Sequence, residues 1–373
     1  MTIGILKEPS PETRVSLLPE ATASLTKQNI TIQVEKSAGE NAYALDKLYQ
    51  AKNINIAERS VILSSSEILL SINPLSEQDI QQLKPSTILI GVYQPLLNYN
   101  IMKQWAEKNI TVFSLDMIPR TTRAQSMDVL SSQANIAGYK AVLEAANIYP
   151  RYFPMLMTAA GSITPAKVLI LGAGVAGLQA IATARRLGAV VEVFDTRPAV
   201  KEEVMSLGAK FIEIEGAADA SKAGGYAVEQ SEEYKQKQQQ KIADSIAKAD
   251  IVITTAQIPG KKAPILITDE MLSNMKPGSV IIDLAAATGG NTLQTINNET
   301  IQYNNVTIVG NSNLASTLPA DASKLYGKNV LNFLQLIITK DGNINLNFDD
   351  DIVTGCCIVH DGKVVNEKIR TMI

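Results

Sequence analysis

The sequence predicts an α/β protein made of two Rossmann-like domains with parallel sheets, joined by two long helices and with a cleft between the domains. Three observations support this fold class. Short apolar strands alternate with amphipathic helices, two longer helical patterns interrupt the alternation, and the 373 residues suffice for about two domains. We therefore expect one domain over residues 1–125, completed by residues 320–373, and a second domain over residues 126–319.

The first domain is expected from short apolar runs separated by amphipathic segments, the pattern typical of a parallel sheet. No glycine-rich phosphate loop occurs in this half of the chain. The expected strands are Ile3–Leu6, Thr31–Val34, Glu67–Ile72, Ser86–Val92 and Thr111–Leu115, and the expected helices are Pro19–Gln28, Glu77–Leu83 and Tyr99–Glu107.

Two long helical patterns are expected to connect the domains. Ser126–Ile148 leads from the first domain to the second, and Ser316–Ile338 returns the chain to the first. Beyond the second pattern, Ile344–Val365 predicts strands with a turn at Asp361–Gly362.

The most informative segment of the second domain is Lys167–Arg197, which predicts a strand, a glycine-rich turn, a helix and a second strand. The apolar run Val168–Leu171 predicts a buried strand, the helix continues to about Leu187, and Val190–Phe194 predicts the next strand. The turn has the spacing G-x-G-x-x-G that is typical of dinucleotide-binding domains, formed by Gly172, Gly174 and Gly177.

Each glycine has a distinct role in such a turn. Gly172 allows the tight bend, Gly174 lets the backbone approach a pyrophosphate, and Gly177 lets the helix pack closely on the strand, while the helix N-terminus directs N–H groups at the phosphates. Asp195, 18 residues after Gly177, is placed to accept hydrogen bonds from the adenosine ribose. Because this carboxylate would repel a 2′-phosphate, we expect NAD(H) rather than NADP(H), and we treat the nearby Arg197 as secondary. The alternative is an α/β unit whose glycines serve only a turn and a packing contact.

The rest of the second domain predicts more strands and one polar segment. Residues Ala217–Gln240 are rich in small and polar side chains with almost no apolar face, so we expect them to be mobile and at the surface. Further strands are expected at Phe211–Ile214, Ile251–Thr255, Val280–Leu284 and Val306–Val309, with a short helix at Asp269–Asn274.

The composition excludes several classes of protein. A net charge of −3 argues against a general nucleic-acid binder. Cys356 and Cys357 are adjacent, and neighbouring cysteines are poorly placed to form a stabilising disulfide, so we expect a reducing compartment. No spacing typical of metal ligands occurs, so we expect no metal. The chain has neither a signal-like N-terminus nor an uninterrupted apolar run of ~20 residues, so we expect no membrane crossing.

The chain also lacks the acid–base residues of most dehydrogenases, which need a general base to oxidise an alcohol or an amine. Its one histidine, His360, is far in sequence from the glycine-rich segment, and we interpret it as a solvent-exposed residue. No Ser/His/Asp set is recognisable, and lysines and tyrosines stay open as possible bases.

A polar cluster, Pro119–Asp128, joins the last strand of the first domain to the first long helix. Because α/β proteins bind ligands beyond the carboxyl ends of their strands, Arg120, Gln125 and Asp128 could hydrogen-bond a carboxamide or a ribose. Alternatively, Ser126 or Asp128 caps the helix and the arginines are solvated. The residues leave both interpretations open.

At this loop the sequence resembles the NAD(H)-binding component, domain I, of proton-translocating nicotinamide nucleotide transhydrogenase. The likeness spans nearly the whole chain, and its length is similar to that of the first polypeptide of the split bacterial alpha subunit, with an alanine dehydrogenase-like fold. The motifs are KEPSPETRVSLLPE, PRTTRAQSMDVLSSQANIAGYKAV, MTAAGSITPAKVLILGAGVAGLQAIATARRLGA, AGGYA, TTAQIPGKKAPILIT and KPGSVIIDLAAATGGN.

The resemblance implies roles for single residues. Arg120, Asp128 and Ser131 would hold the nicotinamide end of NAD(H), Gln125 would reach toward NADP(H) on a partner component, and Tyr226 would belong to a mobile loop that closes over the nucleotide. The other residues expected at the cofactor are Thr121, Thr122, Ser126 and Met127 in the loop, Ala173, Val175, Thr196 and Arg197 beside the three glycines and Asp195, and Gly225, Gln238 and Gln257 further along.

The resemblance also implies an NAD(P)+ transhydrogenase in which hydride passes directly between NADH and NADP+. No proton leaves either substrate, so no general base is needed, and the scarcity of histidine fits this reaction. NADP(H) would be carried by a partner component, the beta subunit, without which the chain is inactive. We expect a cytoplasmic homodimer, peripherally associated with the inner membrane through membrane-spanning subunits that move protons.

Two alternatives stay open. Alanine dehydrogenase shares the fold and resembles the chain at Glu12–Val15, but its catalysis uses a lysine and a histidine in the N-terminal domain. The matching strands here, LLLSINPL and ILIGVYQPL, contain neither residue. The third possibility is a non-catalytic NAD-binding module.

Overall fold

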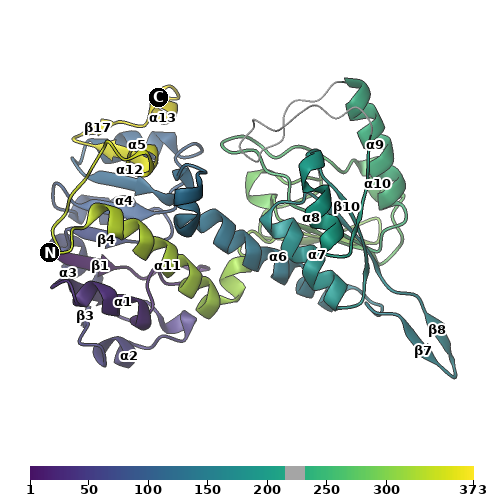
Figure 1. The fold of residues 1–373 in the computed structure, drawn as a ribbon, viewed down its shortest axis with the longest axis horizontal. Helices are drawn as coiled ribbons and strands as arrows, with labels where there is room; N and C mark the ends of the chain where they lie inside the picture. The colour runs from purple at the N-terminus through teal and green to yellow at the C-terminus, as the bar shows by residue number, and fades with distance from the viewer. Residues whose placement is uncertain (215–231) are drawn as a thin grey trace. The chain divides into compact units, whose positions relative to one another are not determined.

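The computed structural model describes residues 1–214 and 232–373. These residues form two compact units: unit 1 comprises Met1–Gln133 and Ala315–Ile373, and unit 2 comprises Ala134–Leu314. Both are α/β units around a mainly parallel sheet, which confirms the predicted fold class (Figure 1). The cleft expected between the domains stays a prediction. Gly225 and Tyr226 lie outside the described residues.

The sheet of unit 1 has the strand order β17-β16-β6-β5-β4-β1-β2-β3. The six N-terminal strands are parallel, whereas β16 and β17 from the end of the chain are antiparallel to their neighbours. The strands are β1 Thr2–Ile5, β2 Thr31–Glu35, β3 Asn55–Ala57, β4 Ile68–Leu70, β5 Ile88–Gly91, β6 Thr111–Ser114, β16 Cys357–His360 and β17 Lys363–Val364.

Both faces of this sheet are buried. Ile68 and Leu70 point into one core, which they share with Phe333, and Leu69 between them points into a second core with Trp105. Because successive strand residues face opposite sides, burial on both sides produces the continuous apolar runs seen in the sequence. The covering helices are α1 Pro19–Thr26, α2 Asp46–Gln50, α3 Arg59–Ser65, α4 Glu77–Gln82, α5 Tyr99–Ala106, α11 Pro319–Ile337, α12 Asp351–Cys356 and α13 Glu367–Arg370.

The sheet of unit 2 has the doubly wound order β11-β10-β9-β12-β13-β15-β14, in which only the edge strand β14 is antiparallel. The strands are β9 Lys167–Leu171, β10 Val190–Phe194, β11 Lys210–Phe211, β12 Ile251–Thr254, β13 Val280–Asp283, β14 Thr300–Tyr303 and β15 Val306–Val309. The helices are α6 Val129–Ile148, which begins in unit 1, and α7 Val175–Arg186, α8 Lys201–Ser206, α9 Glu232–Ile246 and α10 Asp269–Ser273.

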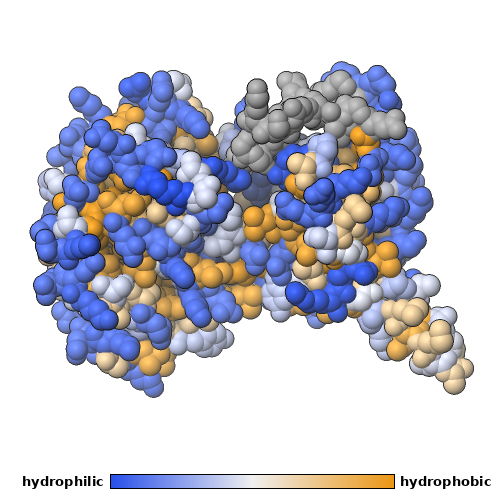
Figure 2. All heavy atoms as spheres, in the orientation of Figure 1, coloured by the Kyte–Doolittle hydropathy of each residue, from blue (hydrophilic) through white to orange (hydrophobic). Residues whose placement is uncertain are grey.

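A two-stranded hairpin, β7 Leu156–Thr158 and β8 Gly161–Ile163, projects from unit 2 and was not expected from the sequence (Figure 1). The side chains of Met155 and Met157 beside and within β7 are 64% and 75% exposed. Figure 2 shows apolar side chains along the hairpin. The hairpin therefore lacks the two-sided burial of the strands in the main sheets.

Two connections differ from the sequence-based expectation. The first long helix begins at Val129 rather than Ser126, because Thr122–Met127 forms a separate 3-10 helix, η3. Ile344–Val365 was expected to contain only strands and a turn, but it includes helix α12. The side chain of Asp350 accepts hydrogen bonds from the N–H groups of Ile352 and Val353 and so starts this helix. The part of the chain that the structure describes contains no helix with the length and apolar content needed to cross a membrane.

Candidate functional site

The glycine-rich turn between β9 and α7 has the geometry that the sequence predicts. Gly172 has a φ of +108°, which favours glycine, and a Cβ on Gly177 would lie 1.9 Å from the carbonyl oxygen of Gly172. A Cβ on Gly174 would instead meet no atom within 4 Å. Gly172 and Gly177 therefore serve the bend and the packing, while Gly174 leaves its backbone accessible to a ligand.

The N-terminus of α7 is open toward this turn. Gly174 is its N-cap residue, and no side chain of the described residues caps it. Val175, the first helical residue, is 39% exposed. An uncapped helix N-terminus beside an accessible glycine fits the pyrophosphate of a dinucleotide, because the first N–H groups of a helix have no partner within the helix.

Asp195 follows β10 and is the best-defined polar residue of the turn. Its Oδ2 accepts a hydrogen bond from the N–H of Ala173 at 2.7 Å. Arg197 donates from Nη2 to Oδ2 at 2.7 Å, from Nε to Oδ1 at 2.9 Å, and from its N–H to Oδ1 at 2.8 Å. These contacts raise the pKa of Arg197. Arg197, treated as secondary in the sequence, is thus the direct partner of Asp195.

This pairing changes how Asp195 can meet a ribose. A carboxylate has about four lone-pair sites, and Ala173 and Arg197 donate to all of them in the described structure. A ribose hydroxyl therefore competes with Arg197 for the same oxygens. The N–H of Ala173 donates to Asp195, so in this structure it does not point toward the place where a phosphate would bind.

A second polar network, which we did not single out from the sequence, lies at the carboxyl ends of β12 and β13. The buried Asp283 accepts hydrogen bonds from the N–H of Asn291 and the hydroxyl of Thr295, both at 2.6 Å. Asn291 in turn bonds the backbone of Ala256 on both its N–H and its C=O. The network fixes the loop after β12, which carries Gln257. An acidic residue that ends a strand was the available signal, as it was for Asp195.

Gln257 and Gln238 are in unit 2. Gln257 is exposed and donates from Nε2 to the carbonyl oxygen of Leu284 at 2.8 Å. Gln238 lies on α9 and is partly exposed, and Thr196 is partly exposed beside Asp195. The contacts of these residues with a nucleotide stay predictions.

The predicted nicotinamide loop is in unit 1, directly after β6 and its short 3-10 turn η2, Leu115–Met117. Arg120, Thr121, Thr122, Gln125 and Ser126 are exposed. Met127, also expected at the cofactor, has its side chain in the core of unit 1 and is only 6% exposed. The 3-10 helix η3 buries Met127 on its inner side and leaves Gln125 on the outside.

Asp128 and Ser131 form a preassembled pair at the start of α6. Asp128 accepts hydrogen bonds from the N–H of Ser131 at 2.9 Å and from its hydroxyl at 2.6 Å. Of the two interpretations that the sequence left open, helix capping therefore describes Asp128 in this structure. The pair still has carboxylate lone pairs that can accept a hydrogen bond from a carboxamide.

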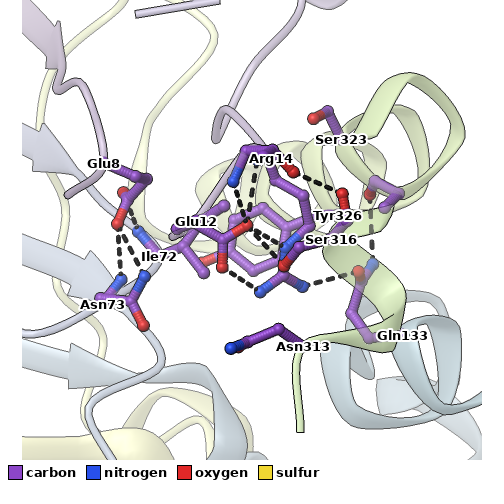
Figure 3. Close-up of polar contacts among 12 residues, drawn as sticks. Glu8, Glu12, Arg14, Ile72, Asn73, Gln133, Asn313, Ser316, Ser323 and Tyr326 are labelled. Atoms are coloured by element: carbon purple, nitrogen blue, oxygen red, sulfur yellow. Dashed lines mark hydrogen bonds and ion pairs between the residues drawn. The ribbon is translucent and has the colours of Figure 1, made fainter. Parts of the chain in front are cut away.

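The Glu12–Val15 motif forms a buried network in unit 1, shown in Figure 3. Glu12 and Arg14 make a double ion pair, with Nη2 of Arg14 2.6 Å from Oε2 of Glu12 and Nε 2.8 Å from Oε1. Arg14 also donates to Oε1 of Gln133 at 2.7 Å, and Ser316 donates to Glu12. These contacts lower the pKa of Glu12 and raise that of Arg14, against the opposing effect of burial. The network joins the N-terminal motif to the start of the returning segment.

His360 lies at the end of β16, far in sequence from the loop Pro119–Asp128, and its contacts are structural. Its Nδ1 is 3.0 Å from the hydroxyl of Thr111, and its ring packs on Phe348 with a centroid distance of 4.6 Å. Its side chain is 26% exposed, so the expectation of a solvent-exposed residue was only partly right. Among the described residues, no group of His, Cys, Asp and Glu side chains is arranged to hold a metal ion.

Comparison with known proteins identifies the chain's relatives. The family models "Alanine dehydrogenase/PNT" match over residues 4–137 for the N-terminal domain and 141–367 for the C-terminal domain. The first polypeptide of NAD(P) transhydrogenase subunit alpha from Rickettsia prowazekii is 46% identical over 99% of this chain and 97% of its own length. The crystal structure of transhydrogenase from Sinorhizobium meliloti superposes with a TM-score of 0.90 at 42% identity, over 98% of this chain and 100% of that chain. L-alanine dehydrogenase shares the fold, with a TM-score of 0.82 at 21% identity over 100% and 98% of the two chains.

Proposed function

This chain belongs to the family of NAD(P) transhydrogenase alpha subunits, and from that premise we propose that it binds NAD(H) and presents the nicotinamide to NADP(H) on a partner component. The observation that carries the proposal is the turn of unit 2, where an accessible Gly174, an uncapped α7 and Asp195 meet. When bound, the nicotinamide ring supplies or accepts a hydride at C4.

The residues of the chain bind and orient in this mechanism. The N-terminus of α7 would bind the pyrophosphate, and Asp195 would exchange its Arg197 contacts for the ribose. Arg120 and the Asp128–Ser131 pair would hold the carboxamide, which fixes the ring face. Such positioning contributes to rate by bringing the reacting carbons to ~3–3.5 Å. No residue has to accept a proton, in agreement with the structural setting of the one histidine.

The wider assembly is part of the same proposal. NADP(H) would be bound by the beta subunit, the chain would act as a homodimer, and membrane-spanning subunits would couple hydride transfer to proton movement. The chain would then sit at the cytoplasmic face of the inner membrane and be inactive alone. The subunit name of its relatives supports the existence of further subunits.

Alanine dehydrogenase activity is the second candidate, and one observation disfavours it. Arg14, the cation of the motif shared with alanine dehydrogenase, donates two hydrogen bonds to the Glu12 carboxylate and one to Gln133. A buried arginine that already has a carboxylate partner offers little to the carboxylate of an amino acid.

The proposed function is tested by mixing the purified chain with an NADP(H)-binding component and following hydride transfer from NADH to an NADP+ analogue. We expect transfer in the mixture and none with either component alone. We also expect calorimetric titration to show binding of NADH and much weaker binding of NADPH. Comparable affinities for the two nucleotides, or turnover of alanine by the chain alone, would contradict the proposal.

Gln125→Asn tests the role of the loop. The exposed amide is shortened by one methylene, so its reach toward the second nucleotide is reduced while the residues proposed to bind NAD(H) are unchanged. We expect NADH affinity within about twofold of the unmodified chain and a fall of about tenfold or more in hydride transfer, because misplacement of about 1 Å has large effects on rate. Equal loss of both properties would place Gln125 in the NAD site instead.

A further inference from the structure

Arg123 connects the loop that carries Gln125 to the C-terminal part of unit 1 through ion pairs. Its Nη1 donates to Oδ2 of Asp350 at 2.6 Å, its Nη2 donates to Oδ1 at 2.8 Å, and Nη2 also contacts Asp351. Asp350 is itself fixed, because it caps α12 through the N–H groups of Ile352 and Val353. A bidentate arginine–carboxylate contact fixes both the orientation of the two side chains and the distance between them.

Helix α11 fastens the same loop at a second point. The side-chain amides of Asn329 and Asn332 both donate to the carbonyl oxygen of Ser126 at 2.8 Å. The side chains of Ala124 and Met127 are buried in the core, 2% and 6% exposed. The backbone on either side of Gln125 is therefore held by three sets of contacts, while the Gln125 side chain is exposed.

We propose that Arg123 is a positioning residue for hydride transfer: its contact with Asp350 fixes the turn Thr122–Met127 and so sets where Gln125 meets the partner component. The inference rests on the proposed function and adds to it a residue outside the nucleotide sites. Arg123 acts through the loop and touches neither nucleotide.

The exposure of this pair explains why its effect is local. The Arg123 side chain is 48% exposed, and those of its partners Asp350 and Asp351 are 18% and 60% exposed. An ion pair whose arginine is this exposed to solvent contributes little to the stability of a whole domain. The proximity of Arg123 lowers the pKa of Asp350 to about 2, so the pair stays charged across the working pH range. Loss of the pair thus loosens the turn without unfolding unit 1.

The test compares four variants of the full chain, one of which is the double variant that combines Arg123→Ala with Asp350→Asn. Arg123→Ala removes the contact, and Asp350→Asn removes its charge while keeping a residue that caps helices well. Lys84→Ala is the control, because Lys84 forms an ion pair with Glu67 at 2.7 Å in the same unit. Glu67 precedes β4 and Lys84 precedes β5, so this pair lies at the opposite ends of the parallel strands from the loop, which follows β6. Hydride transfer with the NADP(H)-binding component, NADH affinity and hydrogen exchange of residues 118–128 are measured for each variant.

We expect Arg123→Ala to lower the rate of hydride transfer by about tenfold to 10²-fold with NADH affinity within about twofold. Exchange of the loop amides should be at least about threefold faster, since the 3-10 turn opens more often. Asp350→Asn should show a smaller loss of the same kind, because Asp351 still pairs with Arg123. The double variant should be no slower than Arg123→Ala alone if both residues act through one contact, and Lys84→Ala should match the unmodified chain.

Different failures are distinguishable. If the unmodified chain transfers no hydride with the partner, the proposed function fails and the role of Arg123 fails with it. If the unmodified chain is active and Arg123→Ala transfers hydride within twofold of it, or exchanges its loop amides at the same rate, only the positioning role is overturned. A fall in NADH affinity equal to the fall in rate also overturns it, because Arg123 would then act on nucleotide binding.

Discussion

At the scale of single residues, our proposal implies that the pair Asp195–Arg197 sets which nucleotide the turn would accept. The carboxylate repels a 2′-phosphate, whereas the guanidinium beside it would attract one. In the described structure each neutralises the other across contacts of 2.7–2.9 Å. If the proposed site binds NAD(H), its selectivity would depend on a charge balance between two side chains rather than on Asp195 alone.

Asp195→Asn should shift this balance. The amide oxygen can still accept from the N–H of Ala173, but the ion pair with Arg197 is lost and Arg197 can meet a 2′-phosphate. We expect NADH to bind about tenfold more weakly, as for the loss of a charged hydrogen bond, and NADPH to bind as well as before or better. Arg197→Ala should act in the opposite direction and weaken NADPH further. Calorimetric titration of both variants checks this, and equal weakening of the two nucleotides by Asp195→Asn would mean that the turn itself had been damaged.

The sequence could predict the position of a polar residue better than its partner. Asp195 was found because an acidic residue ends a strand at a fixed distance from the glycines. Its pairing with Arg197 depends on side-chain rotamers, and the contact of Arg123 with Asp350 joins residues distant in sequence. The capping of α6 by Asp128 was one of two interpretations that the local pattern left open, and side-chain rotamers decide between them.

At the scale of elements, the glycines of the β9–turn–α7 unit have two different roles, close packing at Gly177 and access for a ligand at Gly174. Gly177 has no room for a side chain, and Gly174 has ample room and a φ of −78° that any residue can adopt. Alanine at the two positions therefore tests packing and ligand access separately.

Gly177→Ala should destabilise the protein by about 2–4 kcal/mol, because its Cβ would collide with the backbone of Gly172 and force α7 away from β9. Gly174→Ala should fold with a thermal midpoint within about 2 °C of the unmodified chain, yet bind NADH at least about tenfold more weakly, since its Cβ lies where the pyrophosphate approaches. Thermal unfolding and NADH titration of both variants are the measurements. Full NADH affinity in Gly174→Ala would remove the turn from the nucleotide site.

Elements with a continuous apolar run were predictable, and elements that depend on a partner were not. The central strands such as β12 and β13 are buried along their whole length, so they appear in the sequence as apolar runs. The edge strand β14 exposes alternate residues and contains no such run. Half of the residues of helix α12 are β-branched and favour strands, and the side chain of Asp350 starts the helix.

At the scale of the whole molecule, the C-terminal segment completes the unit that the N-terminus begins. Strand β16 extends the sheet beside β6, and α11 packs Phe333 and Tyr326 into the core that β1 and β4 share. Such pairings join residues more than 200 positions apart, and no local pattern encodes them. Ser316 of this segment also donates a hydrogen bond to Glu12, which is buried together with Glu8 of the N-terminal part.

Glu8 is the buried group through which pH should act on unit 1. It accepts hydrogen bonds from the N–H groups of Ile72 and Asn73 and from the Asn73 amide at 2.5–3.0 Å (Figure 3). Burial, together with the charge of Glu12, raises the pKa of Glu8 from 4.5 to about 7, although the three donors oppose the shift. Arg14, the cation of the neighbouring Glu12 network, is paired with Glu12.

The stability of unit 1 should therefore fall as pH rises from about 5 to 7. Over this range the folded protein keeps a proton on Glu8 that the unfolded chain has already released. The free energy of unfolding therefore falls by about 3 kcal/mol in total between low pH and pH values above 7. Glu8→Gln cannot titrate and resembles the protonated acid, so its unfolding free energy should depend less on pH. Calorimetric unfolding at pH 5, 6.5 and 8 measures the difference, with the exposed Glu20→Gln as control. Parallel pH profiles for Glu8→Gln and the unmodified chain would show that the pKa of Glu8 is not raised on folding, because its three hydrogen-bond donors offset its burial.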